Sequence, residues 1–474
     1  MIAECTTSQL EFGNHGRRRV TACFDGGRLS TEGGGLVLRA TEARIGLMGR
    51  LASCFRDYRE PSAVEHTVQD LVSQRVYGLA LGYEDLNDHN QLRRDSLLAL
   101  LVGKSDIVGA DRRRERDKGR PLASASALNR LELSRPDKAS EHRYKRIPAD
   151  GAALDRLLVE LFLEAYSDAP SEIVLDLDAT DDPLHGDQEG RFFHGYYRCY
   201  CYMPLYIFCG DHLLLARLRR SDRDASAGTL RELAPIVARI REAWPEVRII
   251  LRGDSGFCRE RIMAWCEREG IGYVFGVARN QRLERWLAPA LRKSRRRFHA
   301  TERSSRRFRE CRYRTRSSWT RRRRVVGKAE WLQKGGNPRF VVTNLPRSRA
   351  GKQGLYEKLY CARGDMENRI KEQQLDLYAD RTSTAKMAAN QLRLHFSSFA
   401  YVLLAAFRRL GLAGTSNARL QCGTLRLRFL KIAARLRITH RRVWIHLPTA
   451  FPWQDDFAQA MANLQRKPLY HPPA

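Results

Sequence analysis

The stretch Glu172–Thr180, EIVLDLDAT, is a short apolar run that ends in acids. Its alternation predicts a β-strand whose successive side chains point to opposite faces. One face is apolar and carries Ile173, Leu175 and Leu177. The other face carries two carboxylates, Asp176 and Asp178. Because a buried charge is costly without a cation or a hydrogen-bond donor, these acids require a partner from elsewhere in the chain.

Four more acids follow before Gly190: Asp181, Asp182, Asp187 and Glu189. They lie among proline and glycine, which are typical of turns. We expect all four to belong to a solvated or turn-forming loop.

The chain is strongly basic. Its 474 residues include 84 Lys plus Arg against 54 Asp plus Glu, a net charge of +30. Hydrophobic residues make up 43%, which indicates a globular chain of about two or three domains. The excess of cations predicts a nucleic-acid partner held through its phosphates. An anionic membrane surface is the competing partner, but no polybasic amphipathic helix with an aromatic face is present to bind it.

The cysteines and the apolar runs predict where in the cell the protein resides. The 11 cysteines include no CxxC pair, which argues against a disulfide scaffold and a structural zinc site and favours a reducing cytoplasm. The N-terminus has no apolar core of signal-peptide length. The most apolar run, Phe399–Phe407, is much shorter than the roughly 20 residues that span a bilayer, so we expect a core helix and no membrane partner.

The order of elements predicts the fold class. Residues 1–150 read as a mainly helical DNA-binding domain. From residue 151 a helix leads into the strand described above, and two strands joined by Gly210-Asp211 follow as a hairpin. A helix, the strand Val247–Leu251, another helix and the strand Tyr273–Ala278 complete the series. This is the order of an RNase H-like α/β domain, a mixed five-stranded sheet flanked by helices, and residues 151–285 form its first part.

The rest of the chain is predicted in three parts. Residues 286–345 form a basic, β-rich insertion, in which alternating Arg and aromatic residues favour strands that follow a phosphate backbone. A flexible charged loop is the alternative for this part. Residues 346–412 hold the final core helices. Residues 413–474 form a basic C-terminal segment whose alternating Arg and Leu favour a sheet with one charged face.

Two further carboxylates are candidate partners of the first strand. Asp254 follows the strand Val247–Leu251, in a turn that contains Gly253 and Gly256. In an RNase H-like sheet the first and fourth strands are adjacent and parallel, so Asp254 is expected beside Asp176 and Asp178.

The third candidate comes from a helix. One helical stripe of the segment Tyr360–Gln374 carries Tyr360, Arg363, Glu367, Lys371 and Gln374. Glu367 is the acid that shares this face with the cations. Asp365 and Glu372 are expected on the far, solvated side. The alternative for the stripe is an ordinary ladder of charges on an exposed helix.

Together these motifs resemble the DDE-type insertion-sequence transposases. The motifs are Asp-Ala-Thr after the first strand, Arg-Gly-Asp-Ser-Gly-Phe after a later strand, and Tyr-x2-Arg-x3-Glu on the last helix. The resemblance spans roughly residues 20 to 460 and includes the segments GYEDLNDHNQLRRD and HGDQEG. It is strongest to the branch that has a Tyr–Arg–Glu–Lys signature and a β-rich insertion.

The resemblance implies which residues act. The metal-binding acids fall on Asp178, Asp254 and Glu367, with Asp176 as the alternative to Asp178. The Tyr and Arg of the signature fall on Tyr360 and Arg363. The Lys position, seven residues after the Glu, holds Gln374, and Lys371 lies one turn earlier on the same face. Which of the two fills that role stays open.

The donor set also predicts the cofactor. Carboxylate oxygens suit Mg²⁺ or Mn²⁺, and two ions about 4 Å apart are suited to in-line displacement at phosphorus. We expect Asp178 to bridge both ions and Asp254 and Glu367 to complete one site each. Arg363 and Lys371 would then hold the phosphate, and Tyr360 would orient the flanking strand.

The expected function is that of a prokaryotic, nucleoid-associated transposase. It would bind terminal inverted repeats as a homodimer, cleave them, and join the 3′-OH ends to target double-stranded DNA. The family branch implies a hairpin intermediate. An RNase H-like nuclease or resolvase, and a non-catalytic DNA-binding protein derived from a transposase, are the alternatives.

Overall fold

The computed structural model describes residues 9–465. The chain divides into two compact units. One unit is the continuous stretch Ala149–Val402, and the other combines the residues up to Pro148 with those from Leu403 onward. The basic C-terminal segment therefore folds with the N-terminal residues.

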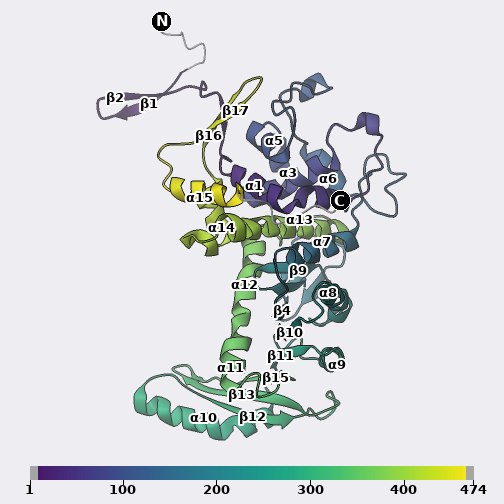
Figure 1. Cartoon of the computed structure of the whole chain (residues 1–474), viewed down its shortest axis with the longest axis vertical. Helices are drawn as coiled ribbons and strands as arrows, with labels where there is room; N and C mark the ends of the chain where they lie inside the picture. Colours follow the sequence, from purple (N-terminus) through teal and green to yellow (C-terminus); the bar gives the residue numbers. More distant parts are fainter. Residues whose placement is uncertain (1–8, 466–474) are drawn as a thin grey trace. The chain divides into compact units, whose positions relative to one another are not determined.

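The central sheet of the unit Ala149–Val402 has the RNase H-like order (Figure 1). Five strands run side by side in the order β9 (His212–Arg217), β8 (Leu205–Cys209), β4 (Glu172–Ala179), β10 (Arg248–Gly253) and β11 (Gly272–Val277). β8 is antiparallel to β4 and to β9, whereas β10 is parallel to both β4 and β11. The predicted hairpin at Gly210-Asp211 joins β8 to β9. The predicted fold class is confirmed.

The two faces of β4 have different environments, as the alternation predicts. The apolar face packs into the main core, with the helices α7 (Gly151–Leu163), α8 (Thr229–Ala243) and α9 (Glu260–Arg268). The acidic face lies toward a long helical segment that runs from Lys352 to Asp376 and includes α11 (Lys352–Gly354) and α12 (Gly364–Lys371). Wide π-helical turns, Leu355–Tyr360 and Glu372–Asp376, lie on either side of α12.

The insertion extends the same sheet instead of forming a separate one. The strands β15 (Arg339–Thr343), β13 (Arg323–Leu332) and β12 (Ser305–Tyr313) continue outward from β11. The expectation of strands is wrong for the first part of the insertion, which is the helix α10 (Gln281–Thr301) lying along β12 and β13 in Figure 1. A helix forms there because Leu283, Leu287, Ala290 and Ser294 are buried at helical spacing.

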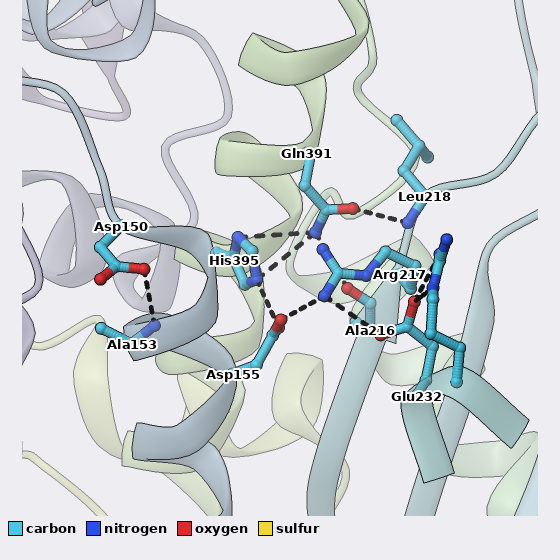
Figure 2. A network of polar contacts seen from close by, with 10 residues as sticks. Asp150, Ala153, Asp155, Ala216, Arg217, Leu218, Glu232, Gln391 and His395 are labelled. Carbon is cyan, nitrogen blue, oxygen red and sulfur yellow. Dashed lines mark hydrogen bonds and ion pairs between the residues drawn. The ribbon is translucent and has the colours of Figure 1, made fainter. Parts of the chain in front are cut away.

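The helix α13 (Met387–Ala406) contains most of the apolar run that was predicted to be a core helix, and Phe399 to Tyr401 are buried. Polar side chains attach it to β9 (Figure 2). The amide of Gln391 accepts from Leu218 N at 2.7 Å and donates to Ala216 O at 3.0 Å. These bonds occupy backbone groups along an edge strand, where another strand would otherwise pair. Among residues 9–465, no helix is long and apolar enough to cross a bilayer.

The second unit is helical around a small sheet. Its helices include α1 (Gly35–Ile45), α3 (Val68–Leu81), α5 (Ser96–Val102) and α6 (Ala125–Glu132). The sheet has the order β17 (Val443–His446), β16 (Ala434–Ile438) and β3 (Arg28–Ser30).

The C-terminal segment is less β-rich than predicted. Residues Cys422–Leu430 are helical, because Cys422, Leu425, Arg426 and Phe429 are buried at helical spacing. The strands β16 and β17 account for the remainder of the predicted sheet.

Candidate active site

Asp254 lies beside Asp178 because of the register of two parallel strands. β4 and β10 pair Asp176 with Arg252 and Leu177 with Gly253, so the next residues along the strands are Asp178 and Asp254. The turn after β10 is held by the Asp254 side chain, whose Oδ1 accepts from the amide of Gly256 at 2.8 Å. The prediction that the first and fourth strands are adjacent and parallel is confirmed.

Asp176 has a different partner from Asp178. Its two carboxylate oxygens accept from Nε and Nη2 of Arg252 at 2.5 and 2.7 Å. Nη1 of the same guanidinium donates to Leu359 O at 2.6 Å. Both charged side chains are buried, and a buried bidentate pair of this kind holds its carboxylate firmly. Asp176 therefore links β4, β10 and the long helical segment through Arg252.

Arg363 connects the first strand to the acid of the helix. Its Nη2 donates to Oε1 of Glu367 at 2.5 Å, and its Nη1 lies 3.5 Å from Oδ2 of Asp178. The predicted stripe thus faces the end of β4, and the alternative of a wholly exposed charge ladder does not apply to Arg363, which is half-buried. One guanidinium is shared by carboxylates from two distant segments.

The electrostatics of the site centre on Asp178. Burial, with smaller contributions from the carboxylates of Asp254 and Glu367, raises the pKa of Asp178 to about 6 against the opposing effect of Arg363. Burial lowers the pKa of Arg363, but the neighbouring carboxylates outweigh it and raise the pKa above its ordinary value. Two carboxylates, those of Asp178 and Glu367, therefore contact one guanidinium, and Asp178 is poorly stabilised in its ionised form.

Tyr360 packs against the backbone near Asp254. A Cβ atom added to Gly276 would lie 2.6 Å from the Tyr360 hydroxyl, 3.0 Å from Ser255 N and 3.2 Å from the carbonyl carbon of Asp254. Gly276 thus allows the ring and the turn of β10 to approach β11. Burial raises the pKa of the Tyr360 hydroxyl, which keeps it a neutral hydrogen-bond donor.

Lys371 and Gln374 differ in environment. Gln374 Nε2 donates to the backbone oxygen of Asp181 at 3.0 Å, which ties the end of the helical segment to the loop after β4. Lys371 is exposed on α12. Gln374 is therefore engaged within the protein, whereas the ammonium of Lys371 is accessible from solvent.

Two acids that were expected to be solvated are buried. Asp182 has 1% of its surface exposed, and burial together with the nearby Asp380 raises its pKa well above the ordinary value. Its Oδ1 accepts from the hydroxyl of Thr382. Glu372 is also buried, against Arg369. The burial of Asp182 was not recognisable from local periodicity, because its partner Thr382 lies 200 residues further along the chain.

The remaining acids of the loop agree with the expectation more closely. Asp187 and Glu189 are exposed, and Asp181 is half-buried. The loop is joined to the segment after the helix by two further bonds: Gln188 Nε2 donates to Thr382 O at 3.2 Å, and Glu189 N donates to Ala385 O at 2.9 Å. These contacts hold the helix that bears Glu367 against the strand that bears Asp178.

The donor set fits a divalent cation. Within the part of the chain that the structure describes, no three acidic, His or Cys side chains already form a metal cluster, and Arg363 occupies the space between Asp178 and Glu367. Carboxylate oxygens are the ligands that Mg²⁺ and Mn²⁺ prefer. The carboxylates here outnumber the single guanidinium of Arg363. A divalent cation would neutralise the remaining negative charge.

Residues 12–469 match a family model described as transposase DDE domain group 1. Among solved structures, a cryo-EM structure of a piggyBac transposase synaptic complex with hairpin DNA is similar over 82% of this chain and 78% of that chain, with 11% identity and a TM-score of 0.38. No curated protein matches the chain.

Proposed function

Because this chain belongs to the DDE-domain transposases of group 1, we propose that it is the transposase of an insertion sequence. It binds the terminal inverted repeats, cleaves the DNA there and joins the freed 3′-OH ends to a target. The observation that carries the proposal is the convergence of Asp178 and Glu367 on Arg363, with Asp254 next to Asp178 in the strand register.

Asp178, Asp254 and Glu367 are the residues that would hold the divalent cations. The chemistry that divalent cations supply at such carboxylates is activation of the attacking oxygen and stabilisation of the leaving oxygen. Asp176 is excluded from this role in our proposal, because both of its oxygens are bonded to Arg252.

The other residues of the stripe are proposed to position DNA. The guanidinium of Arg363, which is bonded to carboxylates in the free protein, can turn its donors to a phosphate. Lys371 is exposed one turn beyond Glu367 and suits a second phosphate contact. The neutral hydroxyl of Tyr360 lies next to the turn of Asp254, where it can orient the strand that flanks the scissile bond.

Synapsis of two ends implies at least two copies of the chain on DNA. We propose a homodimer that acts on DNA in the prokaryotic nucleoid. The net charge of +30 supports binding to DNA, since phosphate contacts supply most of the affinity that does not depend on sequence.

Asp254→Asn tests the proposal. The change keeps an oxygen that accepts from the Gly256 amide but removes the charge. Full-length protein is incubated with Mg²⁺ and with the inverted repeats that flank its reading frame. The wild type is expected to cleave these ends and to join pre-cut ends to a plasmid, and the variant is expected to do neither while binding the ends with unchanged affinity.

Asp187→Asn is the matched control, because it makes the same substitution at an exposed acid of the loop after β4. It should cleave like the wild type. Cleavage that persists in Asp254→Asn would contradict the assignment of Asp254. Cleavage without joining in the wild type would indicate a nuclease and not a transposase.

A further inference from the structure

A small aromatic hairpin follows the strand that carries Asp178. Between β4 and β8 the chain forms a separate three-stranded sheet in the order β5 (Asp182–Pro183), β7 (Cys199–Tyr202) and β6 (Phe192–His194). We call residues Arg191–Tyr202 the aromatic hairpin. The proposed chemistry at the three carboxylates does not use it.

The aromatic hairpin exposes aromatic rings at positions where a surface hairpin ordinarily has polar side chains. Four of its aromatic side chains are exposed: Phe192, Phe193, Tyr196 and Tyr200. Tyr196, in the loop at the tip, has 84% of its surface exposed. Exposed apolar groups that are gathered in one place mark interaction sites more often than single ones do.

The rings are accompanied by arginines. The guanidinium of Arg191 lies 4.8 Å from the ring centroid of Tyr200, and that of Arg220 lies 5.1 Å from the centroid of Phe192. Arg198 is exposed at the tip. Flat rings and guanidinium planes beside positive charge form a surface that suits nucleotide bases joined by phosphates.

The aromatic hairpin is held firmly at its base. The Tyr202 hydroxyl donates to Glu189 O at 2.5 Å, and the Ser221 hydroxyl donates to Phe192 O at 3.0 Å. At the tip, Arg198 N donates to His194 O at 2.8 Å, and Arg198 has a positive φ of 56°. The exposed rings are therefore presented by an ordered element, which lowers the entropic cost of binding.

The hairpin also lies near the carboxylates. Its strand β7 pairs with β5, which begins four residues after Asp178. Tyr197 contacts Tyr196 edge to face, with the ring centroids 5.1 Å apart. The pKa of the Tyr197 hydroxyl is raised to about 12, first by burial and then by the carboxylates of Asp181 and Asp178. Through the pairing of β5, β7 and β6, the hairpin is attached to the segment that directly follows Asp178.

We propose that the aromatic hairpin binds unpaired bases of DNA that has been opened next to the scissile phosphate, with Tyr196 as the leading ring. The proposal rests on the proposed function, which brings a phosphodiester to Asp178. Inside a duplex that phosphodiester is stacked and paired, and opening a base step costs a few kcal/mol. Stacking of the freed bases on Phe193 and Tyr196 offsets this cost.

Binding to two simple probes tests the inference. The probes are a labelled oligothymidylate of about 15 nucleotides and a duplex of the same length, measured by anisotropy with the full-length protein. The double variant Phe193→Ala/Tyr196→Ala is expected to bind the single strand at least about tenfold more weakly, because each stacked base contributes appreciably to affinity. Its affinity for the duplex is expected to stay within about twofold.

Two controls accompany the double variant. Trp444→Ala removes an exposed ring of β17 and is expected to change neither affinity. Tyr196→Phe keeps the ring and is expected to retain single-strand binding. No loss of single-strand binding in the double variant, or an equal loss on both probes, would overturn the proposal. A shift in oligomeric state without loss of single-strand affinity would overturn it in favour of an interface between two copies.

Cleavage supplies an independent readout. The double variant should cleave fully paired inverted-repeat ends slowly, and unpaired mismatches at the cleavage site should restore its rate. Equal impairment on paired and mismatched ends would overturn the stacking role. If the wild type cleaves neither substrate but still binds the single strand through these rings, the proposed function fails while the stacking surface stands.

Discussion

Nη1 of Arg363 lies 3.5 Å from Oδ2 of Asp178, although Arg363 belongs to the helical segment Lys352–Asp376 and Asp178 to the strand β4. The same guanidinium donates to Glu367. In the free protein Arg363 partly neutralises acids that would otherwise repel one another. Divalent ions at these acids would replace Arg363 as their counter-charge and leave its guanidinium available to a phosphate.

The two acids of β4 are expected to respond differently to the loss of charge. Asp178→Asn should abolish cleavage without lowering the free energy of unfolding, because burial already disfavours the ionised form of Asp178. Asp176→Asn should lower the free energy of unfolding by about 3–5 kcal/mol, because it leaves Arg252 buried without its counter-charge. Urea unfolding and a cleavage assay on both variants measure the difference. A folded, fully stable Asp176→Asn protein that has lost cleavage would instead make Asp176 the metal ligand.

Gly276→Ala is expected to disturb the site without replacing a proposed ligand. The new methyl group would lie 2.6 Å from the Tyr360 hydroxyl and 3.0 Å from Ser255 N, so the turn of Asp254 or the ring of Tyr360 must move. A displacement of about 1 Å can lower a rate about 100-fold, and we expect a loss of that order in cleavage with unchanged DNA binding.

Gly364→Ala is the matched control for Gly276→Ala. Gly364 lies in the helix next to Arg363, and nothing lies within 4 Å of an added Cβ there. This change should leave cleavage intact and stabilise the protein by about 0.5–1 kcal/mol. Equal rates for the two variants would show that close packing at Gly276 does not position the site.

Cleavage should depend on pH through Asp178. Its pKa in the metal-free protein is raised to about 6, and a ligand carboxylate must be ionised to bind a cation. The Mg²⁺ concentration for half-maximal cleavage should therefore rise by up to about tenfold per pH unit below 6 and be flat above about 7. The raised pKa of Asp178 also contributes to the free energy of unfolding, but this contribution requires the protonated carboxyl. It is present below the ordinary pKa of Asp and is lost as the pH rises through about 6.

Magnesium titrations at several pH values measure this dependence, with DNA binding in Ca²⁺ as the control. A half-maximal Mg²⁺ concentration that is constant from about pH 5 to 8 would show that protonation of Asp178 does not limit metal binding.

Asp182 is expected to act as a neutral structural group. Its pKa is raised well above the ordinary value by burial and by Asp380, so the amide of Asp182→Asn should replace it without loss of cleavage or stability. Asp182→Ala should lower the free energy of unfolding by about 1–3 kcal/mol, because it leaves the Thr382 hydroxyl without its acceptor. Thermal melts and cleavage assays compare the two. Loss of cleavage in Asp182→Asn at unchanged stability would instead give this carboxylate a functional charge.

Local sequence patterns were sufficient to predict the central sheet and the stripe of the last helix. The alternation of β4 separates its apolar face from Asp176 and Asp178. The spacing of Arg363 and Glu367 brings their side chains within hydrogen-bond distance. Both are properties of near neighbours, since the period of a strand or helix is set by the backbone itself.

Other features depended on contacts that local patterns do not contain. The sequence by itself determined that acids end the first strand. Only the tertiary structure decided that Asp176 is bonded to Arg252, that Asp182 and Glu372 are buried, and that Asp178 is left beside Arg363. The physical reason is that the free energy of a charge depends on its burial and on its partners, and both are supplied by segments far away in the chain.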